Sequence, residues 1–377
     1  MPSKNRSKVP IGTVLEGKFR ITKEIGRGGM AAVYEAENID IGKRVAVKIL
    51  AAELITSRIV RERFVREARA TAKIRSPYIC DVYDFGMYDE RPFLVMELLE
   101  GESLYDMMTR VRRIDPDTTL KICTHVARGL EKAHQNGIVH RDLKPENIFL
   151  TRGENERLIA KILDFGLAKF YETTDGDEKN VRLTREGALF GTPAYMSPEQ
   201  AKGQGHVDHR ADLWALGCIV YECLTGQTVW NVEQGVAMIL AQIAGAPVPI
   251  PSKLRPDLPP GFDAWFARSL HRDVGQRYQT ANEFAESLSQ ALDPRSQRVV
   301  SLLAENEVEE PTQQLLRPDD IPAEPFVGRD GIARSHGDPP ATSPPIKSAT
   351  GTGAFVWLIA LAAVALGGYA LWLYVLN

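Results

Sequence analysis

The chain has 377 residues, of which 44% are hydrophobic, so it is long enough for more than one domain and can bury a sizeable core. Its 46 Lys and Arg residues against 49 Asp and Glu residues give a formal net charge of −3, which argues against nucleic acid as a partner. Four scattered cysteines without CxxC spacing are typical of reduced residues in a cytosolic domain rather than of a disulfide or zinc framework.

The N-terminal residues 1–14 are polar and basic with no apolar run behind them, so we expect no secretory signal. Residues 12–19, GTVLEGKF, fit the spacing of a P-loop, but Phe19 stands where such a loop needs Ser or Thr to reach magnesium. The alternation of Phe19, Ile21 and Ile25 also continues as a strand rather than opening a helix. We therefore interpret the P-loop match as a coincidence.

A glycine-rich hairpin is predicted at residues 25–36, IGRGGMAAVYEA. The segment begins at Ile25 and contains three closely spaced glycines, Gly26, Gly28 and Gly29. Glycines let backbone N–H groups approach phosphate oxygens, and Val33 favours a second strand after the turn. Ala31 stands where a third glycine is usual, and the pattern taken alone is weak, because glycines bend chains for many reasons.

The next predicted strand, residues 44–50, places a small residue and a lysine on one face. Ala46 can admit a flat base on that face, while Lys48 reaches the phosphates. Downstream, apolar residues recur every fourth position over residues 60–72, which predicts an amphipathic helix carrying Glu67. Glu67 is either a surface carboxylate or the group that holds Lys48 in place.

A hairpin with polar residues at one end is predicted further along the chain. The apolar runs 148–150 and 158–163 read as its antiparallel strands, with Asn147 just before the first and Asp164 just after the second. Both side chains then emerge at the same end, where two oxygen ligands suit magnesium. Asp142 lies in an irregular loop that can face the same site.

These segments are part of a longer series of motifs that resembles the protein kinase family, specifically bacterial serine/threonine kinases of the eukaryotic-like type. The series, in order, is GRGGMAAV, VAVK, a helix glutamate, HRDLKPEN, DFG, GTPAYMSPEQ, ADLWALG and RDVGQRY. The resemblance covers roughly residues 15–292. It implies an α+β fold of two lobes, one small and mainly β, the other large and mainly α, and ATP and Mg²⁺ as cofactors.

The resemblance also implies roles for individual residues around the reaction. Asp142 would accept or orient the proton of a substrate Ser or Thr hydroxyl, with Lys144 near the transferred phosphoryl group. Asn147 and Asp164 would hold magnesium. Lys144 within DLKPEN is similar to the serine/threonine type rather than the tyrosine type.

Nucleotide-binding positions follow from the same resemblance. Lys48, paired to Glu67, would contact the α- and β-phosphates, and the segment that includes Glu97 and Leu98 would meet the adenine. The remaining implied nucleotide contacts are Ile25, Gly26, Gly28, Gly29, Val33 and Ala46.

Two further expectations concern the larger lobe. Glu199 and Arg277 match a buried ion pair that braces it, and Asp212 matches a residue that supports the catalytic loop. Two positions depart from the family pattern: Ala31 replaces the last glycine of the loop, and Ser197 gives SPE where APE is commonest.

The C-terminal part of the chain differs from the rest. Residues 293–353 contain nine prolines and little apolar periodicity, which predicts a disordered juxtamembrane linker. Residues 354–376 run without a charge and would span about 34 Å as a helix, against roughly 30 Å of bilayer hydrocarbon. We expect a transmembrane helix there, the alternative being a buried C-terminal helix.

A single-pass inner-membrane protein is therefore expected, with its kinase domain, residues 15–292, in the cytoplasm and its C-terminus at the outer face. Arg334 and Lys347 on the N-terminal flank, with no Lys or Arg after the helix, weakly support this orientation. Ala363 and Gly367, four residues apart, could help two such helices pair.

The expected partners are proteins that present Ser or Thr, the membrane, and a second copy of the chain that is phosphorylated in trans. Arg141, next to Asp142, resembles the arginine that meets a phosphothreonine in kinases switched on by phosphorylation, and Thr184 is the candidate. The alternatives are a catalytically weak kinase-fold scaffold or adaptor, and a protein in which the linker and membrane helix carry the main function. The sequence identifies neither the substrates nor the activating signal.

Overall fold

A computed structural model describes residues 8–28, 31–51, 68, 71–153, 156–165, 193–203 and 207–293. All of them belong to the first of two units into which the chain divides, residues 1–310. Residues 1–7 of the expected N-terminal tail, the linker after Asp293 and the expected transmembrane helix lie outside the described residues. Residues 8–14 are described, and Val9 is buried in the core of the N-terminal lobe, so this part of the expected tail belongs to the folded lobe. Within those residues, no helix combines the length and the apolar character that crossing a bilayer requires.

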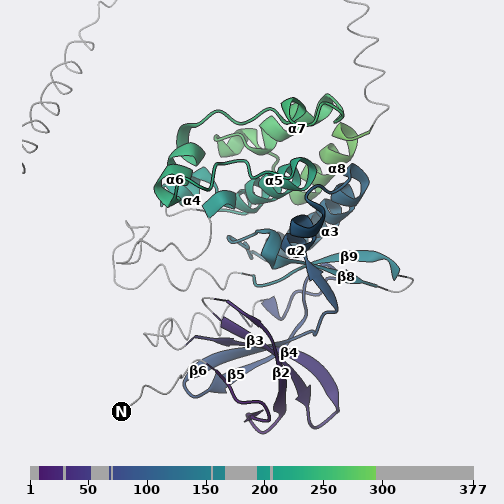
Figure 1. Ribbon diagram of the computed structural model, residues 1–377, viewed down its shortest axis with the longest axis vertical. Helices are drawn as coiled ribbons and strands as arrows, with labels where there is room; N and C mark the ends of the chain where they lie inside the picture. The colour runs from purple at the N-terminus through teal and green to yellow at the C-terminus, as the bar shows by residue number, and fades with distance from the viewer. Residues whose placement is uncertain are drawn as a thin grey trace, which may run out of the picture. The chain divides into compact units, whose positions relative to one another are not determined.

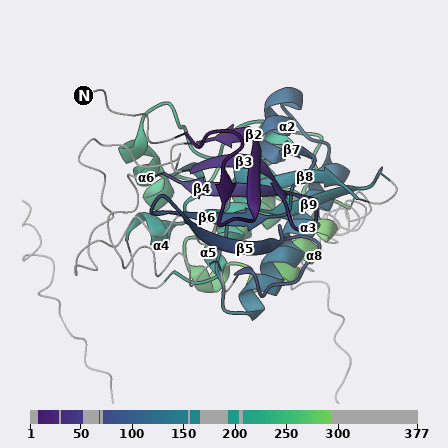
Figure 2. The same cartoon turned by 90° about the horizontal axis from the view of Figure 1, so that it is seen from below.

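The N-terminal lobe is built on a six-stranded antiparallel sheet with the order β1-β2-β3-β4-β6-β5. Figure 2 shows its longer strands side by side in this order. The strands are β1 Val14–Leu15, β2 Phe19–Arg27, β3 Ala31–Asn38, β4 Lys43–Leu50, β5 Val82–Tyr88 and β6 Arg91–Met96. The alternation at residues 19–25 is thus confirmed as strand, and no helix follows the P-loop-like segment.

The two edges of this sheet are tied together by side chains from the turn after β1. Glu16 accepts a hydrogen bond from the backbone N–H of Met87 on β5 at 2.9 Å, and Lys18 pairs with Asp84 at the same distance. The approach is close enough that a Cβ at Gly86 would lie 2.2 Å from a carboxylate oxygen of Glu16. The sheet therefore curls until its first and last strands meet.

The C-terminal lobe is mainly helical, with a small sheet at its junction with the N-terminal lobe (Figure 1). This sheet has the order β7-β8-β9, with strands Gly101–Ser103, Ile148–Arg152 and Leu158–Ile162. The helices are α2 Leu104–Val111, α3 Pro116–Gln135, α4 Pro198–Ala201, α5 Arg210–Thr225, α6 Val236–Gly245, α7 Gly261–Ser269 and α8 Ala281–Ala291. The antiparallel pairing of β8 with β9 confirms the predicted hairpin.

Local sequence signals explain where the main helices begin and end. Asp115 caps α3 by accepting from the backbone N–H of Thr118, and Pro116 occupies the first turn, where its missing N–H costs nothing. Helix α5 ends at Gly226, which has a φ of 72° and lies so close to the backbone of Arg112 that a side chain would collide. These signals fix the two long helices that carry the core.

Helix α5 forms the centre of the large lobe because nearly all of its side chains are buried. A helix that is buried on nearly every side needs neighbours all round it, and α3, α7 and α8 pack against it or around it. All four cysteines are free and buried, which confirms that they form no disulfide.

Candidate active site

The loop between α3 and β8 is fixed by a buried aspartate on α5. Asp212 accepts hydrogen bonds from the backbone N–H of His140 at 2.9 Å and of Arg141 at 2.8 Å. Arg141 has a φ of 64°, a conformation that a residue with a side chain adopts only when its surroundings enforce it. The expectation that Asp212 supports this loop is therefore confirmed.

Asp212 stays ionised although it is buried. Burial alone would raise the pKa of this carboxyl, but the hydrogen bond from His134 at 2.8 Å and the contacts with His140 hold its pKa below the ordinary value. A charged carboxylate accepts hydrogen bonds more strongly than a neutral acid, so the loop is held firmly. This role of His134 was not predicted, since a histidine within a helix gives no signal of its own in the sequence.

Three polar side chains of this loop converge. Asp142 forms an ion pair with Lys144 at 2.9 Å, and the side-chain amide of Asn147 donates to the backbone oxygen of Asp142 at 2.8 Å and to its carboxylate at 3.3 Å. The Asp142 side chain is 40% exposed, so a hydroxyl from another molecule can reach it. The loop thus presents a carboxylate and an ammonium group together at an accessible position.

Asp164 reaches the same place through the hairpin. The backbone N–H of Leu163 donates to the backbone oxygen of Asn147 at 2.8 Å, which joins the chain just before β8 to the chain just after β9. Asp164 has a φ of 57°, again in the left-handed region. This backbone hydrogen bond confirms the prediction that Asn147 and Asp164 lie at the same end of the hairpin.

Lys48 on β4 meets Asp164 from the N-terminal lobe. The two charged groups lie 2.6 Å apart, with their side chains 16% and 22% exposed. The sequence predicted Glu67 as the partner of Lys48, and Glu67 lies outside the described residues, so that pairing stays a prediction. In the described residues the counter-ion of Lys48 is Asp164.

Asp164 and Asn147 have the chemistry of magnesium ligands. The amide nitrogen of Asn147 is engaged by Asp142, which leaves the carbonyl oxygen of the same amide for a cation. A carboxylate and an amide oxygen are hard ligands, and magnesium commonly takes only one or two protein ligands together with phosphate and water oxygens. Among the described residues no cluster of three or more His, Cys, Asp or Glu side chains could hold a metal.

A flat apolar wall lies beside these groups where the two lobes join. Ala46 on β4 pairs with Met96 on β6, and both pack in one cluster with Cys80. Partly buried side chains complete the cluster: Val33, Leu98, Leu99 and Leu163. These residues come from both lobes, so an aromatic base inserted between the lobes would contact apolar atoms on both sides.

The glycine-rich turn lies at the end of β2. Ile25 is 44% exposed, Gly26 pairs with Val33, and the N–H of Gly28 donates to the backbone oxygen of Ala31 at 2.9 Å. Gly29 lies outside the described residues. Ala31 is buried and packs against Leu50, Ala68 and Leu94, so its methyl group belongs to the core.

The side chain of Glu97 is engaged by a residue of the C-terminal lobe. Its carboxylate forms an ion pair with Lys161 on β9 at 2.6 Å. At Glu97 the backbone alone is therefore placed to meet a base, and the assignment of Glu97 as a nucleotide contact does not extend to its side chain. Lys161 was missed by the sequence analysis, because a lysine on a hairpin strand is usually solvated.

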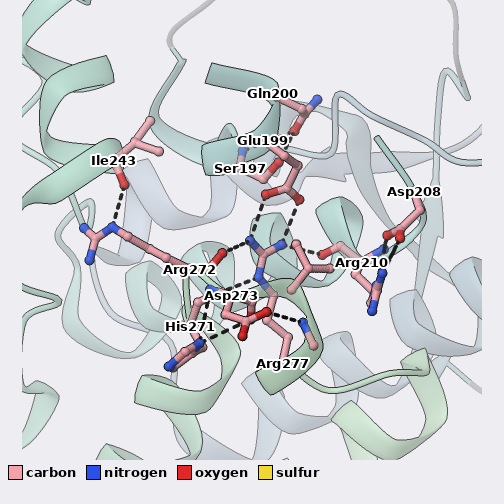
Figure 3. A network of polar contacts seen from close by, with 12 residues as sticks. Ser197, Glu199, Gln200, Asp208, Arg210, Ile243, His271, Arg272, Asp273 and Arg277 are labelled. Atoms are coloured by element: carbon pink, nitrogen blue, oxygen red, sulfur yellow. Dashed lines mark hydrogen bonds and ion pairs between the residues drawn. The ribbon is translucent and has the colours of Figure 1, made fainter. Parts of the chain in front are cut away.

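A buried ion pair braces the large lobe, as predicted (Figure 3). The two terminal nitrogens of Arg277 each donate a hydrogen bond of 2.8 Å to one carboxylate oxygen of Glu199. The Nε of Arg277 donates to the backbone oxygen of His271 at 2.7 Å. Burial opposes ionisation of Glu199, but the contact with Arg277 holds the pKa of its carboxyl below the ordinary value. The Ser197 departure is accommodated here, since its hydroxyl and backbone N–H both bond to Gln200.

One cation beside the loop lacks a full set of partners. The Nε of Arg141 is buried, and within the described part of the chain no group accepts from it. The Nη2 of Arg141 lies 3.5 Å from the backbone oxygen of Val207, which is long for a hydrogen bond. A half-buried guanidinium whose buried Nε–H has no acceptor among the described residues is suited to an anion. Thr184, the candidate phosphorylation site, lies outside the described residues.

The chain is similar to known protein kinases in sequence and structure. Residues 19–290 match the family model for the protein kinase domain. The serine/threonine-protein kinase PknH of Mycobacterium bovis is 34% identical over 87% of this chain and 55% of its own length. The serine/threonine-protein kinase Pkn1 of Myxococcus xanthus is 38% identical over 75% of this chain and 39% of its own length.

Solved structures agree with the sequence comparison. The crystal structure of the Mycobacterium tuberculosis PknI kinase domain superposes with a TM-score of 0.61 at 26% identity and covers 75% of this chain and all of that domain. The chain spans about half the length, or less, of the curated relatives described above. The motifs, the two lobes and the matched family model show together that the chain belongs to the protein kinase family.

Proposed function

We propose that the chain is a serine/threonine-protein kinase that transfers the γ-phosphoryl group of ATP to Ser or Thr hydroxyls of proteins. The observation that carries this proposal is the meeting of Lys48 and Asp164 beside the group formed by Asp142, Lys144 and Asn147. A scaffold needs none of these polar groups in one place. Asp142 is held by its ion pair with Lys144 and by the amide of Asn147.

Each side chain has a distinct task in the proposed reaction. Asp142 accepts a hydrogen bond from the attacking hydroxyl and orients it, and Lys144 offsets negative charge on the phosphoryl group as it moves. Lys48 holds phosphates through its ammonium group, while Asn147 and Asp164 would hold magnesium, which supplies charge neutralisation for the phosphates when it is bound. The apolar wall around Ala46 and Met96 takes the base.

A transfer assay with the full chain tests this proposal. Labelled ATP, magnesium and a library of peptides with Ser, Thr or Tyr acceptors would be used, with the Asp142→Asn variant in parallel. We expect label on Ser and Thr peptides in the wild-type reaction alone. Label on Tyr peptides only would reject the serine/threonine class, and no label on any acceptor would favour a scaffold.

We further propose that residues 354–376 anchor the chain in the inner membrane with the kinase domain in the cytoplasm. An uncharged run of this length and the need for cytosolic ATP support the proposal. Membrane fractionation of cells that express the full chain, compared with a chain ending at Pro294, tests it. Recovery of both forms in the soluble fraction would contradict it.

Phosphorylation of one copy by another is the last part of the proposal. Anchoring confines kinase domains to a surface and raises their effective concentration. The buried Nε of Arg141, for which the described residues offer no acceptor, supports an activating phosphate near the loop.

A further inference from the structure

The side chain of Glu97 joins three segments behind the apolar wall. Its carboxylate lies 2.6 Å from the ammonium group of Lys161 on β9 and 3.5 Å from the backbone N–H of Asp81. The backbone N–H of Glu97 in turn donates to the backbone oxygen of Asp81 at 2.9 Å. The connection between the lobes is therefore attached both to the segment before β5 and to a strand of the C-terminal lobe.

Strand β9 is itself held on both sides. Ile162 pairs with Ile148 on β8, and on its other side it donates to the backbone oxygen of Tyr78 at 2.8 Å and accepts from Cys80 at 2.9 Å. The next residue, Leu163, bonds to the backbone of Asn147. A displacement of β9 would thus be passed directly to the two candidate magnesium ligands, Asn147 and Asp164.

The Lys161–Glu97 ion pair is much less exposed than the surface pairs of the chain. The two side chains are 13% and 26% exposed, against 74% and 77% for Arg152 and Glu156 at the tip of the same hairpin. Screening by water is weak at such a site, so the attraction is stronger than at the surface, and a lone charge left there is costly. The carboxylate of Asp81 is engaged separately, by Arg75 at 3.6 Å.

We propose that Lys161 is a positioning residue that couples the adenine-facing backbone at Glu97 and Leu98 to the magnesium-facing end of β9. The Lys161–Glu97 pair sets the separation between the backbone that meets the base and the carboxylate of Asp164. The positions of the base and of the phosphates of a bound nucleotide then both depend on the Lys161–Glu97 ion pair, although this pair contacts neither of them. This inference rests on the proposed nucleotide-dependent function.

The coupling predicts a loss of nucleotide affinity when either charge is removed. In the full chain, Lys161→Met and Glu97→Gln should each weaken binding of Mg²⁺–ADP at least fivefold in calorimetry. Gln at position 97 keeps the acceptor for Asp81, so that variant removes only the charge. The double variant should bind no more than about twofold weaker than either single one, because the two residues act as a unit.

Three further measurements separate positioning from a merely structural role. Lys161→Arg, which keeps the charge, should restore binding to within twofold of wild type. Arg152→Met, in the exposed pair of the same hairpin, should leave binding unchanged. A structural role would lower the melting temperature of Lys161→Met without changing the affinity of the folded protein.

The outcomes distinguish this inference from the proposed function. Affinities within twofold of wild type for both Lys161→Met and Glu97→Gln, or fully additive losses in the double variant, would overturn the coupling while leaving the kinase proposal intact. A wild-type chain that binds neither ATP nor ADP would overturn both.

Discussion

Lys48 and Asp164 lie 116 residues apart in the sequence and 2.6 Å apart in the structure. Each is the other's counter-ion across the junction of the two lobes, and both side chains are largely shielded from water. In the proposed reaction Lys48 turns to phosphate oxygens and Asp164 to magnesium. Their pairing keeps two charged groups in place without bound nucleotide.

The first prediction concerns Asp142 and Asp164. We expect Asp142→Asn and Asp164→Asn each to lower phosphoryl transfer by orders of magnitude, because one orients the hydroxyl and the other holds the metal. The Asp142 side chain is 40% exposed, so the unfolding curve of Asp142→Asn should stay close to that of wild type. Asp164→Asn removes the counter-ion of the shielded Lys48, so this variant should remain folded but unfold at a lower urea concentration. Asp257→Asn, at an exposed carboxylate that pairs with Arg255 and lies outside this group, is the control. Near-normal turnover in either site variant would contradict the assignment.

The sequence predicted those parts of the fold that depend on nearby residues. The alternation at residues 19–25 and the two apolar runs of the hairpin each specify a strand through local spacing, and the paired Glu199 and Arg277 were found through motif resemblance. The Lys161–Glu97 and His134–Asp212 contacts join residues 64 and 78 positions apart. No spacing rule reports such contacts, because they depend on how the elements pack.

Ala31 shows a different limit of sequence reasoning. The glycine pattern treats this position as part of the phosphate loop, but the structure places Ala31 at the start of β3, opposite Leu50, with its methyl group in the core. The alanine that stands in place of a third glycine therefore affects the packing of the core rather than the phosphate loop. The spacing of the motif locates residue 31 near the glycine-rich turn. Which side chains of β3 face the core depends instead on how β3 pairs with β4, and the motif does not give this pairing.

The second prediction follows from that packing. Ala31→Gly should change the Michaelis constant for ATP by less than roughly tenfold, about 1.4 kcal/mol, because the methyl group does not face the phosphates. It should lower the free energy of unfolding by about 1 kcal/mol, since glycine in a strand gains chain entropy on unfolding and leaves a small void. Steady-state kinetics and urea unfolding measure both. A larger kinetic effect would show that the loop is specialised.

The third prediction concerns the buried Glu199–Arg277 pair. Removing one partner leaves an uncompensated charge, so Arg277→Met should lower the free energy of unfolding by about 3–5 kcal/mol. Arg110→Met, which breaks the exposed pair with Glu102, should cost less than about 1 kcal/mol. Urea unfolding of both variants tests the contrast. If both variants lost the same free energy of unfolding, burial would not make the Glu199–Arg277 pair more important for stability than an exposed pair.

The fourth prediction is a pH dependence that originates at His125. Burial, with help from the nearby cations Lys121 and Arg128, lowers the pKa of this imidazole to about 4 from its ordinary value of 6.5. The unfolded chain therefore binds more protons between these two values, and the stability contributed by neutral His125 is present above about 6.5 and is lost as the pH falls toward about 4.

A substitution isolates this contribution. His125 accepts a hydrogen bond from the backbone N–H of Ala160 and stacks on Tyr78. His125→Asn keeps an acceptor but cannot titrate, so its unfolding free energy should fall less than that of wild type between pH 6.5 and 4.5. Parallel slopes for the two proteins would assign the acid sensitivity to other groups.

The last prediction concerns activation. The buried Nε of Arg141 has no acceptor within the described part of the chain, and its loop also carries Asp142, so an anion bound there would order the catalytic carboxylate. We expect that anion to be phosphate on Thr184. Thr184→Ala should lower activity severalfold, whereas Thr173→Ala should leave it unchanged, and mass spectrometry of active enzyme should find Thr184 modified.

The same phosphate should be added by a second copy of the chain. A chain ending at Pro294 should remain active but should autophosphorylate more slowly than the anchored chain when both are dilute, because anchoring raises the local concentration of kinase domains. Its rate per molecule should rise with concentration. A rate indifferent to concentration would exclude transfer between copies, and an unmodified Thr184 beside another site that tracks activity would move the switch to that site.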